Sequence, residues 1–204
     1  MPIPDRAFRH HPSLKGRVTQ PEDSFIRHMD LAEIDALLVA RGMSGWRRPD
    51  EDRKANCRRM IARRPGPELW VFAYASLMWD PGMEIDELRR AHSPSHARRF
   101  NLLDNLGRGT PDQPGLQSTL DAGGGCTGYA LRIPEEKVEP EAQLLWKREM
   151  ISYGYAPQFV PLQTAQGEVM ALAFLANHGF DRVLDEVDFE TQVRMIATGE
   201  GVLG

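Results

Sequence analysis

This sequence of 204 residues contains little cysteine and no long apolar run. Its two cysteines, Cys57 and Cys126, lie far apart and form no CxxC pair, which argues against a disulfide framework and a zinc ribbon. No segment approaches the roughly 20 apolar residues that a membrane-spanning helix needs. Residues 1–17 also lack the apolar core of a signal peptide. We therefore expect a cytoplasmic protein with no membrane partner.

The sequence also lacks a strong charge of either sign. Its formal net charge is −4, so the overall balance gives no reason to expect nucleic acid as a partner. We find no internal repeat and no low-complexity tract. The length suffices for one large domain with an added helical segment. The sequence does not indicate an oligomeric state.

Motifs for metals, phosphates and nucleophilic cysteines are weak. The glycines at 123–125 are followed by no helix pattern and no GK[ST], so a hairpin turn is the better interpretation. His92 and His96 have a spacing that suits two ligands on a helix, but a proline between them disfavours that helix. Nothing brings Cys126 near His178 as a nucleophile pair. We expect no metal and no cofactor.

The N-terminal third differs from the rest of the chain. Residues 1–22 are polar and dotted with proline, which predicts an extended or poorly ordered arm. Apolar residues then recur at helical spacing until Gly42, a plausible helix stop. The basic segment 41–64 has a thin apolar stripe and is interpreted as a solvated helix packed on the main domain.

The clearest boundary in the chain is the Pro-Gly-Pro at 65–67. It divides the sequence into an N-terminal arm with a helical extension, 1–66, and a main domain, 67–204. The main domain shows mostly strands around one strong helix, which predicts an α+β fold built on a mixed sheet or barrel. The expected strands are 70–76, 97–103, 116–120, 128–133, 159–163 and 169–175, and the expected helices are 140–151 and 181–198.

One acid of the helix at 140–151 lies at an unexpected position. At about 100° per residue, Glu149 falls within an apolar arc, whereas Arg148 points elsewhere. The arc consists of Val138, Ala142, Leu145, Trp146 and Met150. A carboxyl there needs a cationic partner or has its pKa raised by desolvation. Two readings stay open: a structural glutamate paired with Arg108 or Arg132, or a general acid/base.

Three longer segments occur in a fixed order: VFAYASLMWDP (71–81), NLGRGTPDQPGLQSTLDAGGGCTGYALRIPEE (105–136) and LLWKREMISYGYAP (144–157). They resemble the VFGYGSLxWxP, RGTPxxPGLxxxLxxGGxCxGxAYRxP and LWxREMxxGxY motifs of the ChaC-type glutathione-specific γ-glutamylcyclotransferases. The last residues, ATGEGVLG, are similar to that family's ATASGPLG. The likeness covers roughly residues 69–175, and three motifs in order are far more specific than one.

The resemblance implies a small mixed β-barrel with flanking helices, here with an N-terminal helical extension. It also implies a cofactor-independent lyase that acts on glutathione or a related γ-glutamyl compound and releases 5-oxoproline and cysteinylglycine. Glu149 matches the family's catalytic glutamate, the general acid/base. The implied substrate-binding residues are Val71, Phe72, Ala73, Tyr74, Ala75, Ser76, Arg108 and Tyr155.

Some positions depart from the family pattern. Ala73 and Ala75 replace two glycines, and glycine permits positive φ and close approach of a ligand. If both positions have ordinary strand dihedrals, alanine is tolerated. Leu131 replaces a tyrosine, and the chain ends at residue 204, where relatives usually continue into another helix.

Three functions therefore compete. The first is a glutathione-degrading cyclotransferase. The second is a non-catalytic relative that binds γ-glutamyl compounds, which the two alanines motivate and the retained Glu149 opposes. The third is a cyclotransferase for another γ-glutamyl amine or dipeptide.

Overall fold

The computed structural model describes residues 1–40, 42 and 44–201. One mixed sheet forms its centre, with the strand order β1-β5-β2-β6-β7-β4-β3 and an additional pairing of β1 with β7. That pairing closes five strands, β1, β5, β2, β6 and β7, into a ring, while β4 and β3 extend from it. The strands are β1 (Leu69–Ala73), β2 (Glu87–Ser93), β3 (His96–Asp104), β4 (Gly115–Ala122), β5 (Cys126–Ile133), β6 (Tyr155–Thr164) and β7 (Gly167–Ala176).

This ring confirms the predicted small mixed β-barrel. Within it, β1 runs parallel to β7, whereas the other neighbouring pairs are antiparallel. All five residues of β1 are buried, as expected for an apolar strand covered on both faces. The expected hairpin of β6 and β7 is present and turns at 165–166. The first strand is shorter than the predicted 70–76, because Ser76 already begins the 3₁₀ turn η4 (Ser76–Met78).

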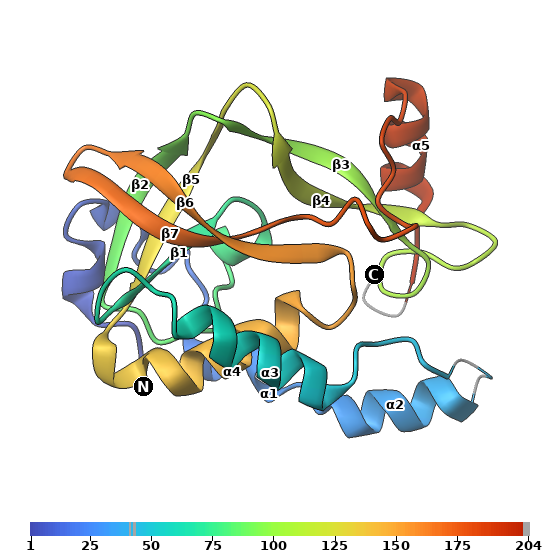
Figure 1. Cartoon of the computed structure of the whole chain (residues 1–204), viewed down its shortest axis with the longest axis horizontal. Coiled ribbons are helices and arrows are strands. Elements are labelled where there is room, and N and C mark those ends of the chain that lie inside the picture. The colour runs from blue at the N-terminus through green and yellow to red at the C-terminus, as the bar shows by residue number, and fades with distance from the viewer. Residues whose placement is uncertain (41, 43, 202–204) are drawn as a thin grey trace.

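Strands β2 to β5 form one long two-stranded ribbon with a kink. In one half β2 pairs with β5, and in the other half β3 pairs with β4. The chain reverses direction at the loop 105–114, at the far end of β3 and β4 (Figure 1). The prediction of a hairpin turn at the glycines 123–125 was therefore wrong. Gly123 and Gly125, with φ of 151° and 111°, kink the ribbon between β4 and β5, opposite residues 94–95.

Four helices lie on one side of the barrel, and a fifth stands beside the β3–β4 ribbon (Figure 1). The first group consists of α1 (Phe25–His28), α2 (Leu31–Ala40), α3 (Asp50–Ile61) and α4 (Val138–Glu149), and the fifth helix is α5 (Phe189–Thr198). The expected helix before Gly42 is thus broken into α1 and α2. The predicted start of the last helix at 181 was wrong, since α5 begins only after its N-cap Asp188 accepts the N–H of Thr191.

Residues 1–22 are not the poorly ordered arm that their composition predicts. They form the turns η1 (Asp5–Phe8), η2 (Pro12–Leu14) and η3 (Pro21–Asp23), and four of their apolar side chains are buried in the main core: Ile3, Ala7, Phe8 and Val18. Glu87, which is fully buried on β2, pairs with Arg9 of this segment and with Arg89. Four buried apolar side chains and a buried ion pair outweigh the polar composition.

The apolar arc predicted for the long helix is confirmed, because all five of its residues are buried; four lie in α4, and Met150 is its C-cap residue. They join residues of the barrel and of the N-terminal segment in one core cluster. The division at 66/67 stays a prediction, although residues from both sides of it share this core. No helix of the described residues is long and apolar enough to cross a membrane.

Candidate active site

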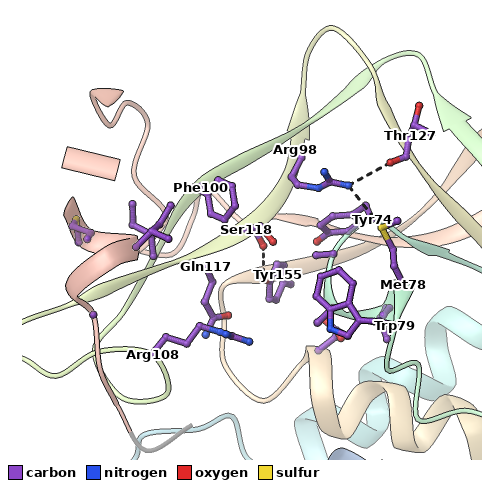
Figure 2. A pocket seen from close by; sticks show the side chains of 18 residues that line it. Tyr74, Met78, Trp79, Arg98, Phe100, Arg108, Gln117, Ser118, Thr127 and Tyr155 are labelled. Carbon is purple, nitrogen blue, oxygen red and sulfur yellow. Dashed lines mark hydrogen bonds between the residues drawn. The ribbon is translucent and has the colours of Figure 1, made fainter. Parts of the chain in front are cut away.

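A cavity of about 730 Å³ opens between the end of β1, the β3–β4 ribbon and α5. Six of the nine residues predicted for the site line it: Tyr74, Ala75, Ser76, Arg108, Glu149 and Tyr155. Figure 2 shows the side chains of Arg108, Gln117, Trp79 and Tyr155 around this space. Segments that are far apart in the sequence therefore meet in one place.

The other three predicted residues do not line this cavity. Val71, Phe72 and Ala73 belong to β1, and all three are fully buried in the core. Their assignment to the substrate-binding loop stays a prediction. Structurally, they form the strand that leads into that loop and hold its first residue in place.

Glu149 is the last residue of α4, and its side chain is only 13 % exposed. Burial raises the pKa of its carboxyl, and the adjacent Arg148 guanidinium opposes that rise. A carboxyl with a raised pKa at the wall of a cavity is suited to proton transfer near neutral pH. The expected effect of desolvation on this carboxyl is thus present.

Arg148 is the cationic partner of Glu149, instead of the two arginines proposed from the sequence. Its Nε lies 2.9 Å from Glu149 Oε1, whereas Arg132 pairs with Asp86. The guanidinium also donates to Ser76 Oγ at 2.6 Å and to the main-chain oxygen of Asp80 at 2.5 Å. The helical angle predicted that the Cβ atom of Arg148 points away from Glu149. The arginine side chain is long enough for its guanidinium to reach the carboxyl nevertheless. Arg148 therefore connects the acid to the loop after β1.

The loop after β1 offers backbone donors to the cavity. Tyr74 is anchored inside the barrel, where its hydroxyl donates to the carbonyl of Phe174 at 2.7 Å. The amides of Ala75 and Ser76 donate to no turn, loop or side chain of the described residues. Ala75 has a φ of −137°, and no described non-glycine residue has positive φ. The alanines in place of the family glycines therefore need no left-handed backbone.

Arg108 is carried by the loop at the tip of the β3–β4 ribbon. The carboxylate of Asp104 accepts the amides of Leu106, Gly107 and Arg108 at 3.0, 2.8 and 2.9 Å. It also accepts a hydrogen bond from the side chain of Gln117. This carboxylate fixes the loop backbone, while the Arg108 side chain stays exposed and forms no ion pair within the described part of the chain.

Close backbone packing holds the same loop from the other side. A Cβ atom on Gly199 would lie 2.5 Å from the carbonyl oxygen of Arg108, and one on Gly201 would lie 2.5 Å from that of Gly107. Neither position has room for a side chain. The backbone of the segment after α5 thus packs directly against the backbone of the Arg108 loop. The rest of the ATGEGVLG element, 202–204, lies outside the described residues.

Tyr155 begins β6 and closes the back of the cavity. Its hydroxyl donates to the carbonyl of Ser118 at 2.9 Å (Figure 2). Burial raises the pKa of Tyr155, and the nearby Glu149 carboxylate adds to that rise. The ring is therefore a neutral wall beside the acid.

Sequence reasoning missed two residues that shape this site. Arg148 directly precedes Glu149 in the sequence Arg-Glu-Met, so the sequence showed that the two residues are neighbours. It did not show that the Arg148 side chain turns toward the carboxyl of Glu149. Asp104 is followed by glycine three residues later, a pattern typical of turns in which an aspartate accepts backbone amides. Trp79 also lines the cavity and belongs to the motif at 71–81, although it was not predicted as a site residue. Met195 and Ile196 line it as well, and no sequence signal singled them out.

The alternative motifs stay apart from this site. His92 and His96 lie on β2 and β3 and contact Thr127 and Ser93, respectively. His178 pairs with Asp121 rather than with a cysteine. No group of three or more His, Cys, Asp or Glu residues in the described ranges could hold a metal ion.

Comparisons with known proteins agree with one another. The sequence model described as "ChaC-like protein" matches residues 69–204. The glutathione-specific γ-glutamylcyclotransferase of Escherichia coli (strain K12) is 38 % identical over 157 residues, covering 76 % of this chain and 68 % of that protein. The glutathione-specific γ-glutamylcyclotransferase 1 of Danio rerio is 31 % identical, covering 67 % of this chain and 72 % of that protein.

The fold comparison points the same way. The crystal structure of a γ-glutamyl cyclotransferase specific to glutathione from yeast superposes with a TM-score of 0.62 at 18 % identity, covering 67 % of this chain and 81 % of that one. At this identity the likeness shows the fold alone. The family match and the bacterial relative carry the assignment. The chain belongs to the ChaC-like protein family.

Proposed function

We propose that this protein is a glutathione-specific γ-glutamylcyclotransferase, a lyase that converts glutathione to 5-oxoproline and cysteinylglycine. One observation carries the proposal: Glu149, a carboxyl with a raised pKa, lines the same cavity as Ala75 and Ser76, whose amides have no hydrogen-bond partner in the turns, loops and side chains of the described residues. The names of the bacterial and fish relatives support glutathione as the substrate.

The reaction needs proton transfer and charge stabilisation. The α-amine of the γ-glutamyl arm attacks the γ-carbonyl of the same arm and closes a five-membered ring, so holding the arm folded supplies much of the acceleration. Glu149 takes a proton from the α-ammonium and later gives one to the departing amine of cysteinylglycine. These steps involve no redox change, and we propose that the enzyme is cofactor-independent.

The other predicted residues take supporting roles. The amides of Ala75 and Ser76 stabilise the oxyanion that forms when the γ-carbonyl is attacked. Arg108, whose guanidinium has no carboxylate partner among the described residues, binds the α-carboxylate of the arm. Tyr74 and Tyr155 form the wall against which the arm folds. Val71, Phe72 and Ala73 support the loop from the core.

The substrate is a small molecule, and we propose a cytoplasmic site of action. The two cysteines are free and buried, which suits a reducing compartment.

The direct test is incubation with glutathione, followed by mass-spectrometric detection of 5-oxoproline and cysteinylglycine. Glu149→Gln keeps the size of the side chain but removes its proton transfer, so turnover falls by about 10²–10⁴-fold. Turnover that persists in this variant contradicts the mechanism. If 5-oxoproline forms from γ-glutamylalanine but not from glutathione, the substrate is another γ-glutamyl compound. If glutathione binds without turnover, the protein is a non-catalytic relative.

A further inference from the structure

A second cavity, of about 430 Å³, lies beside the first one. Both volumes fall within the range of small-molecule sites, roughly 300–1,000 Å³. The two cavities share part of their walls, and Glu149 belongs to the shared part. The shared residues are Ser76, Trp79, Arg108, Gln117, Glu149 and Tyr155. A molecule in contact with Glu149 can therefore extend to both sides of it.

The outer wall of the second cavity comes from the N-terminal helical segment. Ile26 of α1, Ile34 and Leu38 of α2, and Met29 and Trp46 from the adjoining loops line it. All of them precede residues 69–204, the part that matches the family model. This wall therefore lies outside the part of the chain that the family model matches, and it is mostly apolar.

Specific contacts fasten this wall to the helix that ends in Glu149. Arg27 donates two hydrogen bonds to the buried carboxylate of Glu141, at 2.8 and 3.0 Å. Lys147 donates to the main-chain oxygen of Met29 at 2.7 Å. The amide of Arg48 donates to the main-chain oxygen of Ile151 at 2.8 Å. The segment is therefore held in position relative to the acid.

Four charged residues line the second cavity but not the first: Asp80, Asp104, Arg148 and Arg182. Asp104 already accepts the amides of its own loop and Arg148 already pairs with Glu149, which leaves Asp80 and Arg182. Asp80 has one carboxylate oxygen, Oδ1, that is buried without a hydrogen-bond partner in the described residues. Such an acceptor is costly to leave unpaired. Arg182 donates to Asn105 but forms no ion pair in that same part of the chain. The cavity thus offers an acceptor, a cation and an apolar wall.

We propose that the second cavity binds the leaving half of the substrate, a small dipeptide with an amine at one end and a carboxylate at the other. The inference rests on the proposed function, in which that half is cysteinylglycine. Asp80 receives the ammonium that forms after Glu149 has protonated the departing amine, and Arg182 receives the terminal carboxylate. The γ-glutamyl arm occupies the first cavity, so each product has a place of its own.

Binding of the two products separates this inference from the alternatives. Isothermal titration measures the affinity of cysteinylglycine and, in parallel, that of 5-oxoproline. Ile34→Trp fills the second cavity from α2, and we expect about tenfold weaker binding of cysteinylglycine. Leu37→Trp is the matched control, because Leu37 is 47 % exposed and lines neither cavity. Affinity for 5-oxoproline should stay within about twofold in both variants.

Asp80→Asn gives a second test that adds no bulk and keeps the shape of the side chain. It should weaken cysteinylglycine binding without lowering the melting temperature. The proposal is overturned if cysteinylglycine does not bind, or if it binds Ile34→Trp and Asp80→Asn as tightly as the unchanged protein. These titrations need no turnover, so glutathione cleavage combined with unchanged cysteinylglycine binding refutes this inference and leaves the proposed function intact.

Discussion

The two sides of the candidate site are held in different ways. The acid side, Glu149 with Arg148 and Ser76, joins the end of α4 to the loop after β1, and both elements are packed in the main core. The arginine side, the Arg108 loop, lies at the tip of a two-stranded ribbon outside the closed barrel. It is fixed by one carboxylate and by close glycine contacts. The proposed proton-transfer group, Glu149, is thus placed by the core, and the proposed carboxylate-binding group, Arg108, by local backbone contacts.

The comparison predicts the largest effect on the acid side. Arg148→Gln removes the contact with Glu149 and both contacts with the β1 loop, and a misplacement of about 1 Å can cost about 10²-fold in kcat/KM. Arg148 lowers the pKa of Glu149 against the effect of burial, so its removal raises that pKa further. Because the base acts deprotonated, the acid limb of the kcat/KM profile moves to higher pH.

A pH profile of glutathione turnover checks this prediction. Besides Arg148, Tyr74 and Tyr155 interact electrostatically with Glu149, and the substitution alters neither of them. Lys147→Gln is the control, since it removes the same charge one position earlier, where the side chain contacts Arg27 and Met29. An acid limb that stays in place in Arg148→Gln refutes the electrostatic role, even if the rate falls.

On the arginine side we expect a smaller effect, mainly on substrate affinity. Gly199→Ala places a Cβ atom 2.5 Å from the carbonyl oxygen of Arg108, so the loop has to shift. KM for glutathione should rise about tenfold while kcat changes little. Gly124→Ala is the control, because nothing lies within 4 Å of its Cβ position. Equal KM values for the two variants would show that the contact does not position Arg108.

The smallest effect is expected where the chain departs from its family. Ala73→Gly with Ala75→Gly restores the family pattern, but neither position has positive φ, so the loop does not require glycine. Activity should change by less than about twofold, and the free energy of unfolding should fall by about 0.5–1 kcal/mol per site. Steady-state kinetics measure the activity, and urea unfolding measures the free energy of unfolding. A large gain in activity would show that the alanines narrow the site.

Much of the fold and part of the site followed from local patterns. The five-residue apolar arc of α4 was predictable because helical periodicity sets the direction of each Cα–Cβ bond. The same rule placed Glu149 toward the core but misplaced Arg148, since it says nothing about where a long side chain ends. The glycines at 123–125 were predicted to form a hairpin turn, but they form a kink in a continuous ribbon. Glycines with positive φ occur in both hairpin turns and strand kinks, so the sequence does not distinguish the two.

By itself, the sequence determined the α+β class, the apolar arc that contains Glu149 and the family motifs, whose resemblance implied the barrel. Periodicity and motifs are local patterns that can be read without the fold. Only the tertiary structure decided three further features. It placed four apolar side chains of residues 1–22 in the core, joined Arg148 to Ser76 and to the backbone of Asp80, and built a second cavity from α1, α2 and the barrel. Each of these depends on contacts between segments many residues apart, where burial and charge pairing outweigh local composition.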